Sequence, residues 1–152
     1  MAQEITAGAV GALRQAVAEA AQRVLEAMCF ADVIGAADED LGTDAFGVEV
    51  RFHGSERGLF RMWMNEAVSC RLAADFLGLE EAGPEEGRQV ALELANMICG
   101  CAVSQLARNG ALRLDPPCAT AAAMPAHATR LAMDAGVVAF TLDEFEEVEK
   151  PS

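Results

Sequence analysis

Residues 84–109 have the sequence PEEGRQVALELANMICGCAVSQLARN, and this stretch decides the predicted fold. Pro84 is tolerated in the first turn of a helix, and the two glutamates that follow it favour the positive end of the helix dipole. Asn109 and Gly110 form a typical C-terminal cap. The stretch therefore predicts a helix of about 25 residues, which at about 1.5 Å per residue is about 37 Å long.

Two other helices are predicted before this one. In residues 6–30 the apolar side chains recur at helical spacing, and glutamine and glutamate side chains follow the opposite face. A shorter helix is predicted after Asn65, whose side chain suits an N-terminal cap, and Gly78 closes it. Residues 79–83 then form a loop. The chain is therefore expected to contain two long helices and a short one between them.

Four segments have the pattern of β-strands. Residues 46–53 alternate between apolar and other side chains, with the period of two that is typical of a half-buried strand. Residues 54–58 predict a hairpin connection into a second strand at residues 59–65. Further strands are predicted near residues 129–133 and 137–142. This order predicts an α+β fold, with two long helices packed on one face of a largely antiparallel sheet.

Length and charge limit the class of protein. The chain has 152 residues, so we expect residues 1–152 to form a single domain. Eleven basic against 24 acidic residues give a formal net charge of −13, which repels phosphate backbones and anionic lipids, so no nucleic acid and no membrane partner is expected. No apolar run reaches the ~20 residues of a membrane span. The acidic runs at residues 38–44, 80–86 and 143–149 are interpreted as solvated loops and a tail, and the last of them could instead extend the final strand.

The five cysteines indicate a reduced, cytoplasmic protein. Their number is odd, their spacing matches no disulfide framework, and no secretory signal precedes the domain. Cys99 and Cys101 point about 200° apart on the predicted helix, so they cannot bind one ion together, and we interpret them as buried thiols. The two histidines give no zinc-binding spacing. The absence of a Gly-x-Ser-x-Gly elbow and of a phosphate-binding glycine loop argues against serine hydrolases and nucleotide enzymes.

A narrow polar face follows the helix of residues 84–109. At about 100° per residue, an arc of about 80° contains Gln89, Glu93, Asn96, Gly100 and Ser104. Most residues around this arc are apolar, and we expect those at positions 92, 94, 98 and 103 to point inward or sideways. Gly100 costs about 1 kcal/mol relative to alanine in a helix interior, and its missing side chain leaves a notch. The spacing alone also fits a solvated face or a close packing contact between two helices.

The segment ELANMICG at residues 93–100 resembles the Glu-x-x-Asn-x-x-x-Gly signature of the CheC, CheX and FliY phosphatases of bacterial chemotaxis. The order of elements resembles CheX in particular. The signature helix follows an N-terminal helix that ends near residues 24–28, a hairpin with Phe46 and Phe60, and a short helix that ends at residues 76–78. These features cover most of the chain and imply a CheX-like fold.

The resemblance implies a phosphatase that acts on the aspartyl phosphate of CheY or a related response-regulator receiver domain. In such proteins the matching asparagine orients a water molecule for in-line attack, and the matching glutamate pairs with a receiver lysine. Carried over, Asn96 would orient the water and Glu93 would dock the receiver, with Gln89, Gly100 and Ser104 as partner-binding positions. Mg²⁺ would belong to the receiver, so no cofactor is expected in this chain. A homodimer is also implied, with the sheet edges as candidate interfaces.

Two differences from the CheC pattern leave alternatives open. CheC proteins carry a second motif on their first helix, where this sequence offers only Glu19 and Gln22; these residues could form a second site or belong to the solvated face of that helix. CheC-type signatures often include a proline further along the chain, where this sequence has Ala119, so the loop there is expected to differ. The alternative function is a noncatalytic CheX-like module that binds a receiver or stabilises a dimer.

Overall fold

The structure is a computed structural model, and it describes residues 7–37, 39–54, 56–106 and 112–147. Its elements follow the chain in the order α1 (Ala7–Cys29), β1 (Val33–Ala36), β2 (Phe46–His53), β3 (Glu56–Met64), α2 (Glu66–Leu77), α3 (Pro84–Leu106), β4 (Arg113–Leu114), β5 (Cys118–Thr120), β6 (Thr129–Met133) and β7 (Gly136–Glu147). The three helices lie where the sequence predicts them. The predicted C-terminal cap at residues 109 and 110 falls outside the described residues.

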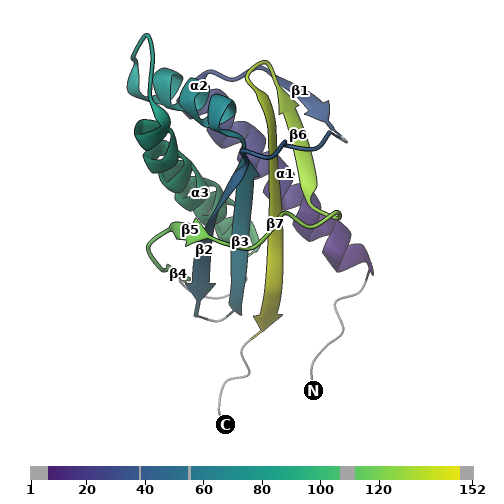
Figure 1. The fold of residues 1–152 in the computed structure, drawn as a ribbon. Helices are drawn as coiled ribbons and strands as arrows, with labels where there is room; N and C mark the ends of the chain where they lie inside the picture. The colour runs from purple at the N-terminus through teal and green to yellow at the C-terminus, as the bar shows by residue number, and fades with distance from the viewer. Residues whose placement is uncertain (1–6, 38, 55, 107–111, 148–152) are drawn as a thin grey trace.

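The strands form one seven-stranded sheet in the order β1-β6-β7-β3-β2-β4, and β5 also pairs with β2. Every strand pair in it is antiparallel. Figure 1 shows α1 and α3 on one face of this sheet, with α3 near the edge formed by β2, β4 and β5 and with α2 beside it. The predicted fold class, α+β with two long helices on one face of a largely antiparallel sheet, is confirmed.

The core lies between the helices and the sheet. Alternate residues of β2 and β3 face the helices and are almost fully buried, namely Val48, Val50, Phe52, Phe60, Met62 and Met64. From α3, Leu94, Ile98 and Val103 are buried and Leu92 is half-buried, in agreement with the helical periodicity. Gly87 lets α3 approach α2 closely, because a Cβ atom there would lie 2.6 Å from Oγ of Ser69. The core therefore fixes which side of α3 faces outward.

The hairpin between β2 and β3 is tighter than the sequence predicts. We expected residues 54–58 to connect the strands, but β3 begins at Glu56, and Gly58 pairs with Phe52 inside the ladder. A Cβ atom on Gly58 would lie 2.6 Å from Cζ of Phe52 and 2.9 Å from the backbone oxygen of Asp143. This glycine therefore marks a close approach of a phenylalanine ring and of β7, and it is not part of a turn.

Both predicted caps of α2 are present. Oδ1 of Asn65 accepts a hydrogen bond from the backbone N–H of Val68 at 2.8 Å, which satisfies one of the free donors of the first turn. Gly78 adopts the left-handed conformation with φ of 69° and donates its N–H to the carbonyl of Ala74. The loop after Gly78 then leads to Pro84, where α3 begins.

The structure adds three short strands that the sequence does not predict, and it decides between two alternatives at the C-terminus. β1, β4 and β5 have four, two and three residues, too few to show an alternating pattern. The sequence left open whether the acidic run from Asp143 extends the last strand or frays, and in the structure its first residues extend β7 to Glu147, where they pair with β3. Backbone pairing with β3 therefore outweighs the charge of this segment. Among the described helices, none combines the length and apolarity that a membrane span requires.

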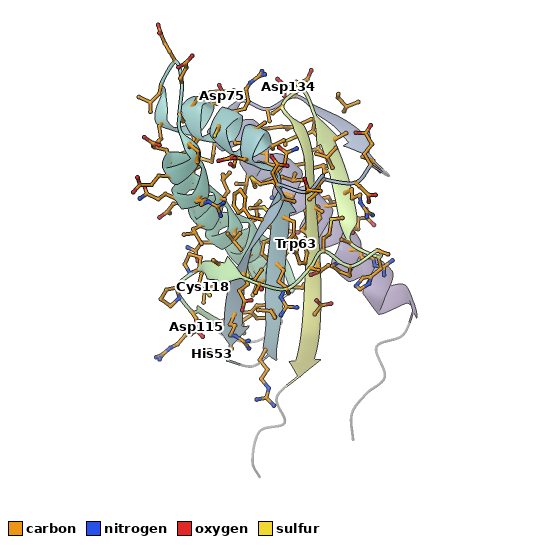
Figure 2. The ribbon with its side chains drawn as sticks, in the orientation of Figure 1. His53, Trp63, Asp75, Asp115, Cys118 and Asp134 are labelled. Carbon is orange, nitrogen blue, oxygen red and sulfur yellow. The ribbon has the colours of Figure 1, made fainter. Side chains whose placement is uncertain are left out.

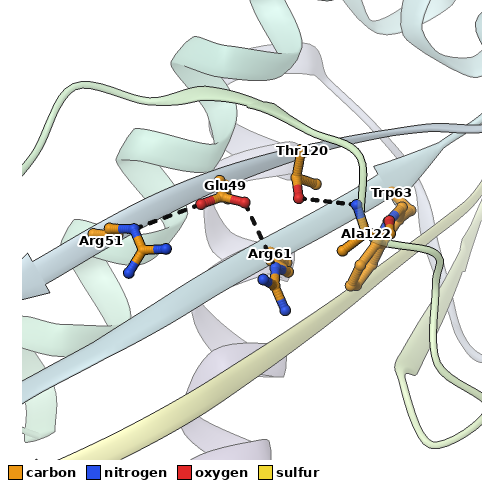
Figure 3. A network of polar contacts seen from close by, with 6 residues as sticks. All are labelled: Glu49, Arg51, Arg61, Trp63, Thr120 and Ala122. Carbon is orange, nitrogen blue, oxygen red and sulfur yellow. Dashed lines mark hydrogen bonds and ion pairs between the residues drawn. The ribbon is translucent and has the colours of Figure 1, made fainter.

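The face of the sheet opposite the helices is partly covered by the chain between β5 and β6, which crosses in front of the strands in Figure 1. Nε1 of Trp63 donates to the carbonyl of Ala122 at 2.9 Å, and Trp63 packs with Leu41, Ala128 and Ala139 in a second, small cluster. Glu49 lies on the same face, where its two carboxylate oxygens form ion pairs with Arg51 and Arg61, as Figure 3 shows. Each oxygen lies 3.7 Å from the Nε atom of its arginine. The chain between β5 and β6 is therefore attached to the sheet through Trp63. This attachment helps to hold β5 on β2, at the edge of the sheet next to α3.

Candidate active site on helix α3

Helix α3 buries one face and exposes the other. The buried face consists of Val90, Ala91, Leu94, Ala95, Ile98, Cys99, Ala102 and Val103. The five residues that the sequence singles out lie together on the opposite face, with Gln89, Glu93 and Ser104 exposed and Asn96 and Gly100 half-buried. The arc expected from the sequence is therefore a continuous strip on the surface of the protein, and the rest of α3 anchors it to the core.

Glu93 and Asn96 occupy the middle of this strip. They are three residues apart, so their Cβ atoms are neighbours on the helix surface at about 5–6 Å. Within the described part of the chain, neither side chain has a hydrogen-bond or ion-pair partner. The Asn96 amide thus keeps a donor and an acceptor for a ligand, and the Glu93 carboxylate is available for an external cation.

Gly100 leaves the next turn of the strip bare. Apart from the adjacent residues and the backbone of α3 itself, the one described atom within 4 Å of a Cβ placed on Gly100 is Cδ2 of Leu114, at 3.7 Å, which is an ordinary van der Waals contact. No helix comes close enough there to require a glycine. The close helix packing that the spacing also allowed is therefore wrong for this position, and the backbone of α3 is accessible beside Asn96.

The two ends of the strip have different surroundings. Gln89 is exposed, and its neighbour Arg88 places its guanidinium 4.5 Å from the ring centroid of Phe46, against β2. Ser104 is also exposed, and its Oγ donates to the carbonyl of Cys101 at 3.0 Å. A hydroxyl bonded to its own helix still has lone pairs that can accept from a ligand.

Leu114 of β4 borders the strip, although no sequence pattern marks it as a site residue. β4 pairs with the end of β2, where Leu114 lies opposite Phe52. The backbone N–H of Asp115 donates to the carbonyl of Arg51 at 2.8 Å, and Oδ1 of Asp115 lies 2.9 Å from Nε2 of His53. Figure 2 labels His53 and Asp115, which lie at the same end of the sheet. With two residues, β4 is too short to leave a periodic signal in the sequence.

The other candidate positions are separate from this strip. Glu19 accepts a hydrogen bond from Gln15 and Gln22 donates one to Glu26, so both belong to pairs one turn apart on the exposed side of α1. Such pairs are typical of a solvated helix face. A second site at Glu19 and Gln22 stays a prediction, with no observation in the described residues that favours it.

The cysteines of α3 have the environment of packing residues. Cys99 is fully buried, and this burial raises the pKa of its thiol from 9.0 to about 12, so it is protonated at neutral pH. Cys101 is half-buried on another side of the helix. In the part of the chain that the structure describes, no group of three or more histidine, cysteine, aspartate or glutamate residues could hold a metal ion.

Comparisons with known proteins agree with this architecture. A family model described as "Chemotaxis phosphatase CheX" matches residues 46–141, which is more than half of the chain. No curated protein sequence matches the chain. CheX from Vibrio vulnificus has a similar structure, with a TM-score of 0.69 and 14% sequence identity over 85% of this chain and 93% of that one.

Two further solved structures have the same fold. A CheX-CheY-BeF3-Mg complex from Borrelia burgdorferi matches with a TM-score of 0.64 and 19% identity, over 85% of this chain and 95% of that one. CheX from Desulfovibrio desulfuricans matches with a TM-score of 0.63 and 14% identity, over 87% of this chain and 99% of that one. Together, these matches show that the chain has the fold of the CheX proteins. The family match is more particular, and the chain belongs to the chemotaxis phosphatase CheX family.

Proposed function

We propose that this protein hydrolyses the aspartyl phosphate of a CheY-like receiver domain, with Asn96 orienting the attacking water. The observation that carries the proposal is the side-chain amide of Asn96, which has no hydrogen-bond partner among the described residues. It is half-buried on α3, between Glu93 and the uncovered backbone at Gly100. Phosphoryl transfer depends mainly on placement of the reactants and on neutralisation of charge. An amide can accept a hydrogen bond from the water and donate one to a phosphoryl oxygen, so it suits this placement.

Glu93 is proposed to dock the receiver through a lysine of the partner. Its carboxylate is exposed and has no ion-pair partner among the described residues, so it is available to a cation from outside. Gln89 and Ser104 extend the docking strip on either side. Mg²⁺ is proposed to be held by the receiver, beside the phosphoaspartate. The reaction is proposed to take place in the cytoplasm, and a homodimer is the proposed assembly.

The test is release of phosphate from purified receiver domains of the same genome, each phosphorylated by a small-molecule phosphodonor. We expect the wild-type protein to accelerate phosphate release. The acceleration by Asn96→Ala should be about a hundredfold smaller, which is a typical effect of removing one catalytic hydrogen-bonding group. Gln105→Ala is the matched control, because Gln105 is an exposed amide on the same helix, about 180° away from Asn96. This control variant should act like the wild type.

Binding separates catalysis from recognition. Asn96→Ala should still bind a receiver activated with beryllofluoride, because the change removes a water-orienting group and leaves the docking strip in place. Glu93→Gln should instead weaken binding, since it removes the charge and keeps the size of the side chain. Wild-type protein that binds activated receivers without accelerating release from any of them would establish the noncatalytic module in place of the phosphatase.

A further inference from the structure

Leu114 forms an apolar wall beside the notch at Gly100. Its Cδ2 atom is 3.7 Å from the position that a Cβ atom of Gly100 would occupy, and no other described atom outside the helix backbone lies within 4 Å of that position. The outward strip of α3 therefore has two parts. One part is polar, with Glu93 and Asn96, and the other is bare backbone next to a leucine side chain.

Leu114 is held in this place by the contacts of β4. The strand pairs with the end of β2, the N–H of Asp115 donates to Arg51, and the carboxylate of Asp115 contacts His53. Leu114 packs against the main core on one side, yet it remains half-buried. A fixed and partly exposed leucine beside a binding strip costs little conformational entropy when a partner covers it, which favours its use as a contact.

The glycine at position 100 is not explained by the fold alone. An alanine there would make an ordinary contact with Leu114 and would remove the cost of about 1 kcal/mol that a glycine adds in a helix interior. The fold would therefore gain from a methyl group that fills this space. Leaving the space open is useful if a partner residue enters it and contacts Leu114.

We propose that Leu114 is a specificity-determining residue, which packs against an apolar side chain that the receiver places next to its phosphoaspartate. This inference rests on the proposed phosphatase function and adds a contact from a second element to it. The polar part of the strip would position the reacting groups. The wall formed by Leu114 would select receivers that present an apolar residue at this point.

The test compares Leu114→Ala with Leu112→Ala. Both leucines are half-buried, belong to the same segment and pack against the same core, so their loss should cost similar stability. Of these two leucines, only Leu114 lies within 4 Å of the Cβ position at Gly100.

We expect Leu114→Ala to raise the receiver concentration that gives half-maximal phosphate release about tenfold and to leave the maximal rate unchanged. The affinity for beryllofluoride-activated receiver should fall by the same factor, which corresponds to about 1.4 kcal/mol. Leu114→Met should retain most of the affinity.

The outcomes that oppose the inference are distinct from those that oppose the proposed function. Unchanged affinity in Leu114→Ala, or an equal loss in Leu112→Ala, would overturn the role of Leu114 while the phosphatase stands. Loss of maximal rate without loss of affinity would also overturn it, because it would place Leu114 in the chemistry and not in recognition. Wild-type protein that binds the activated receiver without turnover would overturn the phosphatase and leave the affinity comparison as a valid test of Leu114.

Discussion

Five glycines of this chain illustrate two kinds of position, one required by the fold and one not, and the difference bears on the site. At Gly47, Gly58, Gly87 and Gly136, a Cβ atom would come within 2.5–2.6 Å of a neighbouring side chain, so the fold itself requires the glycine. At Gly100 a Cβ atom would meet only Leu114, at an ordinary distance of 3.7 Å. The last glycine is therefore the one in this group whose presence points to an external partner.

Gly100→Ala should accordingly stabilise the protein and impair its function. The expected rise in the free energy of unfolding is about 1 kcal/mol, because alanine has the higher helix propensity and fits the space. The affinity for activated receiver should fall, because the added methyl group narrows the notch. Denaturant unfolding and a binding titration measure the two effects. Gly58→Ala is the contrasting variant and should lose stability. A Gly100→Ala protein of normal affinity would show that the notch is not used.

Sequence spacing could predict the residues of the site that lie on one element, because helical geometry fixes their arrangement. Glu93, Asn96 and Gly100 share a face of α3 for that reason alone. Leu114 could not be predicted in the same way. Its position depends on the pairing of a two-residue strand with the end of β2, and such long-range pairing leaves no local pattern.

Among the elements, β1 is the edge of the sheet farthest from the candidate site. It pairs with β6 on one side only, and Figure 1 shows it at the opposite end of the sheet from β4 and β5. Its Ile34 side chain is 74% exposed, and the nearby Phe30, just after α1, is 79% exposed. An edge strand with exposed apolar side chains can pair with a second copy of itself, and two-fold symmetry makes such a contact self-complementary.

The proposed homodimer is therefore expected to form through β1. Ile34→Lys should convert it to a monomer, because a charge on the exposed side of the edge strand opposes pairing. Leu79→Lys is the matched control, since Leu79 is an exposed leucine, at 48%, on the loop between α2 and α3. Sedimentation equilibrium of both variants measures the state of assembly. A wild-type monomer, or an Ile34→Lys variant that still dimerises, would exclude this interface.

The longer elements were predictable and the shortest were not. Helices α1, α2 and α3 and strands β2, β3 and β7 are each long enough to repeat their period, and α2 has caps at Asn65 and Gly78 that the sequence displays directly. β1, β4 and β5 form because longer strands offer them backbone partners. The same dependence on partners explains why the sequence alone could not decide whether the acidic residues after Asp143 extend β7, as they do, or fray.

In the molecule as a whole, two buried thiols make stability sensitive to alkaline pH. Burial raises the pKa of both Cys29 and Cys99 from 9.0 to about 12, with a smaller contribution from Asp75 at Cys29. Between these values the unfolded chain loses thiol protons that the folded chain retains. Their contribution is therefore fully present below about pH 9 and is lost as the pH rises toward 12.

We expect the free energy of unfolding to fall between pH 9 and 12. The thiols should dominate this change, because the sequence has no tyrosine and a single lysine, Lys150. Replacing both Cys29 and Cys99 with alanine should flatten the pH dependence, although the double variant starts from lower stability. Cys118→Ala should leave the pH dependence unchanged, because Cys118 is exposed. Urea unfolding across this pH range, under reducing conditions, gives the slopes. Equal slopes in the wild type and the double variant would exclude the two thiols as the cause.

The central claim is that Asn96 orients water toward the phosphoaspartate of a receiver domain. The most direct measurement is the decay of a phosphorylated receiver in a single turnover, with this protein in excess and its concentration varied. The account predicts a decay rate that rises with wild-type protein to a plateau, and an acceleration about a hundredfold smaller with Asn96→Ala, although that variant still binds. A wild-type protein that leaves the decay unchanged for every receiver it binds, or an Asn96→Ala protein as fast as the wild type, would contradict it.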